Sequence, residues 1–204
     1  MKMKRTIDPI RVAAMLLALL LMLTLAGCGS SGSGLDRKAS YTAVIEVADY
    51  GTITVLLDQK AAPITCANFV SLAESGFYDG LTFHRIMEGF MIQGGDPSGN
   101  GTGGSGTTIK GEFEANGVKN KLSHTRGAIS MARSSLSYDS ASSQFFIVQQ
   151  DALFLDGQYA AFGYVTDGME IVDAIAADAV PTDDNGTIPP DEQPVITSVT
   201  IVKE

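Results

Sequence analysis

The chain is poor in the side chains that most often bind metals, form disulfides or attack substrates. Its 204 residues include two cysteines, two histidines and no tryptophan. His84 and His124 have no cysteine or carboxylate at the spacing of a metal site. No Gly-x-Ser-x-Gly segment marks a nucleophilic serine. We therefore expect neither a metal nor another cofactor, and hydrolysis is a weak hypothesis.

Basic residues are also scarce. The chain has 14 Lys and Arg residues against 23 Asp and Glu residues, which is a formal net charge of −9. Because phosphate binding needs basic patches, this balance excludes a general nucleic-acid-binding protein. The sequence shows no internal repeat, and its length fits one domain with a short extension. We expect a monomer.

The N-terminus has the pattern of a secretory signal. Basic residues within 2–11 precede an uncharged run over 12–27. The run is shorter than the ~20 residues of a membrane-spanning helix, so it indicates a signal peptide over residues 1–27. The run ends in Leu-Ala-Gly before Cys28, which resembles the bacterial lipobox, where the cysteine is lipidated and becomes the mature N-terminus. The alternatives are a transmembrane anchor or a plain signal peptide.

Processing at Cys28 would leave residues 28–40 as a lipidated, Gly- and Ser-rich tether and residues 41–204 as the folded domain. The mature chain would carry a net charge of −12, because the signal peptide contains four basic residues and one acid. Anionic headgroups repel such a domain, so membrane attachment would depend on the lipid. Cys66 would then have no disulfide partner, and we expect it to be a small buried residue.

From residue 41 onward, short alternating strands dominate the pattern. A helix is predicted from Pro63 to about residue 75, and a second over 168–176. Residues 179–194 are rich in Pro, Asp and Gly and are expected to form an excursion. This pattern predicts a mainly β domain and leaves a barrel and a sandwich equally open. The predicted strands are 41–47, 52–57, 81–86, 90–94, 109–113, 128–132, 145–148, 161–165 and 195–202.

Residues 83–96 (FHRIMEGFMIQGGD) are the most informative segment. Two strands joined by a turn would form a hairpin, and residues of like parity on a strand face the same way. The hairpin can therefore set Arg85 beside Phe90, Met91 and Gln93. A fixed guanidinium over an apolar floor, with an amide nearby, suits a neutral, partly apolar ligand that presents a lone pair.

This segment resembles the core signature of the cyclophilin family of peptidyl-prolyl isomerases, Phe-His-Arg-x-x-x-x-Phe-x-x-Gln-Gly-Gly-Asp. The likeness covers roughly residues 41–202, in order and without a large gap. The resemblance implies a closed eight-stranded antiparallel barrel capped by two α-helices. Further matches lie at Gly101–Gly104, Glu112–Phe113, His124–Gly127, Ser130–Ala132, Ser143–Ile147, Leu155–Gly157 and Phe162–Gly163.

The resemblance also implies site residues. Arg85 would be the catalytic residue, donating a hydrogen bond to the proline nitrogen as the amide twists. Apolar side chains would hold the proline ring, while glutamines and the main chain of 132–134 would bind the peptide backbone. The implied substrate-binding residues are Phe90, Met91, Gln93, Ala132, Arg133, Ser134, Gln144, Phe146, Phe154, Leu155 and Tyr159.

Three site residues depart from the common family pattern. Arg133 stands where Asn is usual, and we expect its contact to be made chiefly through the backbone. Phe154 replaces a frequent Trp and Tyr159 a frequent His, so the wall stays aromatic but loses an indole N–H. Sensitivity to cyclosporin is therefore an open question.

The expected function is isomerisation of X-Pro bonds in secreted or envelope proteins by a lipid-anchored enzyme outside the cytoplasm of a bacterium. The alternative is a chaperone or scaffold that grips proline-containing segments with little need for turnover, and the presence of Arg85 favours the enzyme. Gly99-x-Gly101-x-x-Gly104 formally matches a dinucleotide-binding fingerprint. Because β-prone residues follow it instead of a helix, we expect a glycine-rich loop that wraps the site.

Overall fold

The computed structural model describes residues 34–204. The predicted signal peptide, Cys28 and the first part of the tether lie outside the described residues. Within residues 34–204, no helix is long and apolar enough to cross a membrane.

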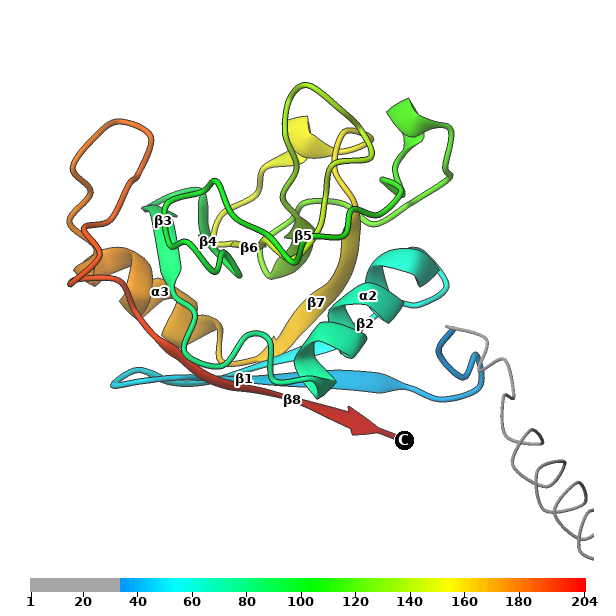
Figure 1. The fold of residues 1–204 in the computed structure, drawn as a ribbon, viewed down its shortest axis with the longest axis horizontal. Coiled ribbons are helices and arrows are strands. Elements are labelled where there is room, and N and C mark those ends of the chain that lie inside the picture. Colours follow the sequence, from blue (N-terminus) through cyan, green and yellow to red (C-terminus); the bar gives the residue numbers. More distant parts are fainter. Residues whose placement is uncertain (1–33) are drawn as a thin grey trace, which may run out of the picture. The chain divides into compact units, whose positions relative to one another are not determined.

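Eight strands form one antiparallel sheet in the order β3-β4-β6-β5-β7-β2-β1-β8 (Figure 1). Each strand is short, and buried apolar residues alternate with more exposed ones along β1 and β2, as expected where one face of a sheet covers a core. The strands are β1 (Tyr41–Val47), β2 (Gly51–Leu57), β3 (Phe83–Met87), β4 (Met91–Gly94), β5 (Ala128–Met131), β6 (Phe145–Val148), β7 (Ala161–Asp167) and β8 (Ile196–Lys203).

The two edges of the sheet meet through residues that flank β3 and β8. Thr82 and Val195 form an isolated bridge between them. The Phe83 N–H donates to the Pro194 carbonyl at 2.9 Å, and the Ile196 N–H donates to the Leu81 carbonyl at 2.8 Å. The sheet therefore curls into a barrel whose last side is a short junction. With two helices against it, the predicted eight-stranded antiparallel barrel capped by two α-helices is confirmed.

Helix α2 (Pro63–Glu74) and helix α3 (Met169–Asp178) lie close to their predicted positions. Helix α2 packs against β8, while α3 packs against β2 and β4. Both helices bury one apolar side against the sheet, which explains why neither needs strong intrinsic helix propensity. Cys66 is among the buried residues of α2, as expected.

One predicted strand is wrong. Residues 109–113 form no strand; Ile109 makes a single bridge to Ala141. The Gly111 N–H donates to the Asp139 carboxylate at 3.0 Å instead of to a neighbouring strand. A short 3₁₀ turn, η1 (Glu114–Asn116), follows directly. The alternating pattern here reflects the burial of Phe113 in the core and not sheet pairing.

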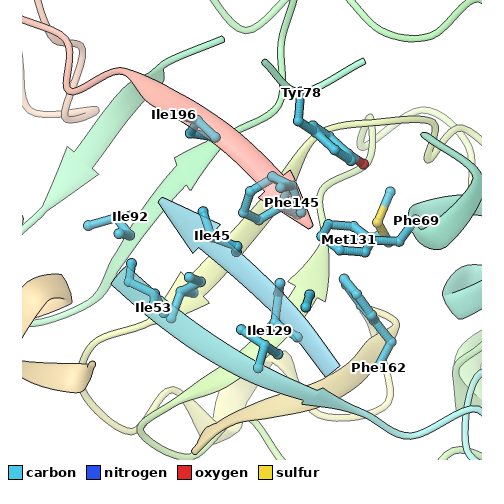
Figure 2. Packing of buried hydrophobic residues seen from close by; sticks show 14 of the residues in the cluster. Ile45, Ile53, Phe69, Tyr78, Ile92, Ile129, Met131, Phe145, Phe162 and Ile196 are labelled. Atoms are coloured by element: carbon cyan, nitrogen blue, oxygen red, sulfur yellow. The ribbon is translucent and has the colours of Figure 1, made fainter. Parts of the chain in front are cut away.

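The main core fills the space inside the curled sheet. Aromatic rings from four elements or their flanks meet at its centre, with ring centroids of Phe69 and Tyr78 5.1 Å apart and those of Phe69 and Phe162 5.2 Å apart. Figure 2 shows this packing around Ile45, Ile53, Phe69, Tyr78, Ile92, Ile129, Met131, Phe145, Phe162 and Ile196. A second, smaller apolar cluster comprises Met91, Ala128, Phe146, Val148, Ala152 and Leu155.

Helix α2 begins without a side-chain cap from its own N-cap residue, Ala62. The buried Glu112 carboxylate supplies the missing acceptors. It accepts hydrogen bonds from the Ile64 N–H at 3.1 Å and from the Thr65 N–H and hydroxyl, both at 2.7 Å. An anion at a helix N-terminus also interacts favourably with the helix dipole. Residue 112 therefore ties the start of α2 to the loop that precedes η1.

We expect Glu112→Ala to lower the free energy of unfolding by about 2–4 kcal/mol, because two helix N–H groups lose a charged acceptor. Urea unfolding of both proteins measures the difference. Glu74→Ala is the matched control, since Glu74 is exposed at the end of the same helix and should change stability by less than about 0.5 kcal/mol. Equal stability of the Glu112→Ala variant and the wild type would contradict this role.

Candidate active site

Arg85 is half-buried on β3, and its guanidinium is held from two sides. Its Nε donates to the Asn185 carbonyl at 2.7 Å, and its Nη1 donates to Gln93 Oε1 at 3.2 Å. The sulfurs of Met87 and Met91 complete the surroundings at 3.1 and 3.7 Å. Burial lowers the pKa of Arg85, but an arginine stays charged at neutral pH. The site thus contains a fixed cation that has no carboxylate among its hydrogen-bond partners in residues 34–204.

Asn185, which accepts the hydrogen bond from Arg85 Nε, belongs to a loop about a hundred residues away in the sequence. This loop joins α3 to β8 and runs along the outer edge of β3, where the Ile86 N–H donates to the Gly186 carbonyl at 2.8 Å. Within it, the Asp183 carboxylate accepts the N–H groups of Asn185 and Thr187, both at 3.0 Å. The loop is therefore held by hydrogen bonds of its own in addition to its contact with Arg85.

Asn185 is a site residue that sequence reasoning missed. Residues 179–194 were expected only as an excursion, and the Asp-Asn-Gly segment at 184–186 is an ordinary turn signal that points to no function. Asn185 lies beside β3 because the chain before β8 pairs with β3 and the residue that precedes it. This pairing is a tertiary contact.

The predicted apolar residues form one cavity of about 320 Å³ beside Arg85. Its floor is the smaller apolar cluster, from which Met91, Phe146 and Leu155 reach the cavity. Phe154 is 72% exposed at the rim and lies 5.6 Å from the Phe90 ring, centroid to centroid. The lining residues are Arg85, Phe90, Met91, Gln93, Ala132, Arg133, Phe146, Phe154, Leu155 and Tyr159.

The two remaining predicted residues, Ser134 and Gln144, line an adjoining polar cavity of about 440 Å³. Gln93, Ala132 and Arg133 line both cavities and form the boundary between them. The structure therefore brings all the predicted substrate-binding residues together around two neighbouring hollows. Their roles in binding remain predictions.

A chain of amides links Arg85 to the glycine-rich loop. Gln93 Nε2 donates to Gln144 Oε1 at 2.9 Å, and Gln144 Nε2 donates to the carbonyls of Gly101 and Gly103 at 3.1 and 2.8 Å. The loop itself is held by the Asp96 carboxylate, which accepts the Gly101 N–H at 2.6 Å. This arrangement fits the expectation of a loop that wraps the site.

The main chain at 132–134 offers fewer free groups than expected. The Ala132 N–H donates to the Gln144 carbonyl at 2.9 Å, and the Ser134 N–H donates to the Ser140 hydroxyl at 2.9 Å. Within residues 34–204, only Arg133 has both its N–H and its carbonyl without a hydrogen-bond partner in this segment. A bound peptide could therefore pair with the backbone of Arg133.

The floor of the apolar cavity rests on a line of polar groups, of which His124 and Ser130 are buried and Asp156 is exposed. His124 Nδ1 lies 2.8 Å from the Asp156 carboxylate, and His124 Nε2 lies 3.0 Å from the Ser130 hydroxyl. The His124 ring stacks on Phe146 at 6.0 Å. Although the order of groups is that of a nucleophilic triad, Ser130 is completely buried and no substrate can reach it. We interpret this line as a support for Phe146.

His84 also lies close to Arg85 but has a different environment. Its side chain is buried, and neither ring nitrogen has a hydrogen-bond partner within the described residues. No group of three potential metal ligands occurs within residues 34–204.

The chain matches the family model for cyclophilin type peptidyl-prolyl cis-trans isomerases over residues 42–202. It is 50% identical over 122 residues to peptidyl-prolyl cis-trans isomerase B of Bacillus subtilis, covering 60% of this chain and 81% of that protein. It is 42% identical over 174 residues to peptidyl-prolyl cis-trans isomerase A of Dickeya dadantii, covering 80% and 86% of the two chains.

A solved structure shares the fold. The cyclophilin type peptidyl-prolyl cis-trans isomerase of Cryptosporidium parvum, crystallised in the presence of the dipeptide Ala-Pro, superposes with a TM-score of 0.69. The two sequences are 30% identical, and the match covers 80% of this chain and 99% of that one.

The buried histidines predict that the protein loses stability in mild acid. Burial lowers the pKa of His84 and His124 from the ordinary 6.5, and Asp96 and Asp156 offset part of this effect. Below about pH 6.5 the unfolded chain therefore binds protons that the folded chain does not. The free energy of unfolding consequently decreases as the pH is lowered. Each histidine contributes up to about 1.4 kcal/mol per pH unit.

Urea unfolding between about pH 5 and 7.5 measures this slope. His84→Gln removes one titrating group. It should reduce the dependence of the free energy of unfolding on pH by up to about 1.4 kcal/mol per pH unit, which corresponds to one proton. A slope that is the same in both proteins would show that His84 titrates alike in the folded and unfolded states.

Proposed function

We propose a mechanism and a place of action for this chain, which belongs to the cyclophilin family of peptidyl-prolyl cis-trans isomerases. The family match over residues 42–202 and the identity to isomerases of two bacteria make it a peptidyl-prolyl cis-trans isomerase. Its substrates are proline-containing peptides.

The proposed mechanism is non-covalent. Amide resonance places a barrier of ~18–20 kcal/mol in the path of rotation about the X-Pro bond. As the amide twists, its nitrogen becomes pyramidal and gains a lone pair that can accept a hydrogen bond. Arg85 donates to this lone pair, an interaction that exists mainly in the transition state and therefore lowers the barrier.

One observation carries this proposal: the Arg85 guanidinium stands fixed beside an apolar cavity without a carboxylate partner. A carboxylate would compete for its N–H groups and weaken its donation to a neutral nitrogen. Anchoring to Asn185 and Gln93 leaves the cation in place before the substrate arrives, so little reorganisation is needed at the moment of rotation.

The floor of the cavity fits the proline ring. Met91, Phe146 and Leu155 are buried residues that still line the cavity, and Phe90 closes its side. We infer that the ring packs there while Gln93 and the Arg133 backbone bind the peptide on either side of the bond. This placement sets the proline nitrogen beside Arg85.

We expect Arg85→Ala to lower kcat/KM on a short X-Pro peptide by about 10²- to 10³-fold, the usual cost of losing one transition-state donor. Arg126→Ala is the matched control, because Arg126 pairs with Asp173 and lines neither cavity. A rate for Arg85→Ala equal to that of the control would contradict the mechanism.

Suppression of client aggregation by the same variants separates isomerisation from the alternative of holding. If Arg85→Ala retained full protection of clients while losing isomerisation, the role in the cell would be that of a chaperone.

We also propose that the enzyme acts outside the cytoplasm on secreted or envelope proteins, anchored by a lipid on Cys28. The support is the order of features in the sequence: a basic start, an uncharged run, a lipobox-like end and a Gly-Ser tether before the first strand at Tyr41. Two acyl chains, which bacterial lipoproteins carry, are sufficient for stable anchoring.

The anchor proposal predicts that the full-length protein, expressed in a bacterium, enters the detergent phase and carries acyl mass at Cys28. Cys28→Ser should remain unprocessed or be released, because serine lacks the thiol that takes up the lipid. Cys66→Ser is the control, since the buried Cys66 lies inside the folded domain and should leave partitioning unchanged. Recovery of the wild type in the aqueous phase without acyl mass would contradict the anchor.

A further inference from the structure

Arg85 lines the apolar cavity alone, whereas a second arginine, Arg133, lines both cavities. The proposed mechanism does not use its guanidinium. The Arg133 guanidinium lies between three aromatic rings, with its central carbon 4.6 Å from the Tyr159 centroid, 5.0 Å from Tyr138 and 5.4 Å from Phe113. Its Nε donates to the Gln158 carbonyl and its Nη1 to the Ser134 carbonyl, each at 3.0 Å. Neutral groups thus fix its position and leave its charge uncompensated.

Within the part of the chain that the structure describes, no carboxylate forms an ion pair with Arg133. The ion pairs within residues 34–204 involve other cations, such as Arg126, which pairs with Asp173 at 2.6 Å. The residues that line the two cavities include two arginines and no acid. In a chain with 23 acids and 14 bases, this is a local reversal of charge at the place where substrate binds.

The polar cavity beside Arg133 has the chemistry of an anion subsite. Its other side-chain groups are hydroxyls and amides, from Thr102, Ser134, Ser135, Ser140, Ser142, Gln93 and Gln144. Serine hydroxyls and the second amide N–H of Gln93 can donate to a carboxylate, and no acid lines the cavity. Both amide N–H groups of Gln144 are already bound to carbonyls of the glycine-rich loop. Three of the five N–H groups of Arg133 have no hydrogen-bond acceptor within residues 34–204, because two are donated to carbonyls.

We propose that Arg133 and the polar cavity form a subsite for an acidic side chain close to the substrate proline. The proposal rests on the isomerase activity and adds a sequence preference to it. The three aromatic rings hold the Arg133 guanidinium in place before a ligand binds. Binding a carboxylate therefore costs little side-chain entropy. Peptides with Glu or Asp near the proline should therefore be turned over faster than peptides with Ala or Lys at the same position.

The test uses short peptides with Glu, Ala or Lys placed in turn at each position from three before the proline to two after it. Acetylated and amidated ends leave the varied side chain as the only charge. We expect kcat/KM for the best Glu peptide to exceed that for its Lys counterpart by roughly three- to ten-fold at low salt. Near 1 M salt, where the screening length is about 3 Å, the ratio should shrink towards one.

Three variants assign the preference to residue 133. Arg133→Gln should remove the Glu-to-Lys ratio, Arg133→Lys should keep part of it, and Arg133→Glu should invert it. Arg126→Gln, which removes a cation outside both cavities, should retain the wild-type ratio. Arg85 is present in all four proteins, so its own charge cannot explain a difference among them.

Turnover of the Ala peptide shows separately whether each variant is an active isomerase. If Arg133→Gln fails to fold, Arg133→Lys and the salt series in the wild type still decide the matter. An unchanged ratio in Arg133→Gln, or a wild type with equal kcat/KM for Glu and Lys peptides at every position, would overturn the proposal.

Discussion

The site depends on keeping an arginine half-buried and charged without giving it an acid. A carboxylate would satisfy Arg85 but would also occupy the N–H groups that face the substrate. The fold solves this with neutral acceptors, the Asn185 carbonyl on one side and Gln93 on the other. Because each acceptor comes from a different segment, the hairpin of β3 and β4 and the loop before β8 must both be in place. Closing the barrel at β3 and β8 brings them there.

The support of the site is separate from the main core. The large aromatic core inside the sheet holds the fold together, while a smaller apolar cluster carries the floor of the proline cavity. A hydrogen-bonded line runs from the exposed Asp156 through the buried His124 to the buried Ser130, and the His124 ring stacks on Phe146. Buried polar groups whose hydrogen bonds are satisfied, as at His124 and Ser130, stabilise one arrangement over others. The orphaned nitrogens of His84 show that not every buried polar group beside the site is satisfied within residues 34–204.

Two arginines of the site use different means to stay available. Both donate to carbonyl oxygens, but Arg85 is otherwise surrounded by sulfurs, whereas Arg133 is surrounded by aromatic rings. Both means fix a cation without neutralising it. Arg126, on the exposed surface, shows the contrasting case of a cation paired to a carboxylate. The overall acidity of the chain makes the absence of acids around the two cavities a local property of the site.

The sequence by itself determined a mainly β domain, the two helices and most strands, because alternation, Pro63 and the turn residues are local signals that need no distant partner. Its pattern left a barrel and a sandwich equally open, and the family resemblance pointed to the barrel. The family signature also placed Arg85 and its apolar neighbours, which the hairpin brings together over a few residues. Periodicity failed at 109–113, where burial of Phe113 imitated a strand. Only the tertiary structure decided that Glu112 caps α2, that Asn185 holds Arg85 and that three rings enclose Arg133. Each of these contacts includes residues far apart in the chain, and no local pattern records which distant groups the closed sheet brings within hydrogen-bond or ring-contact distance.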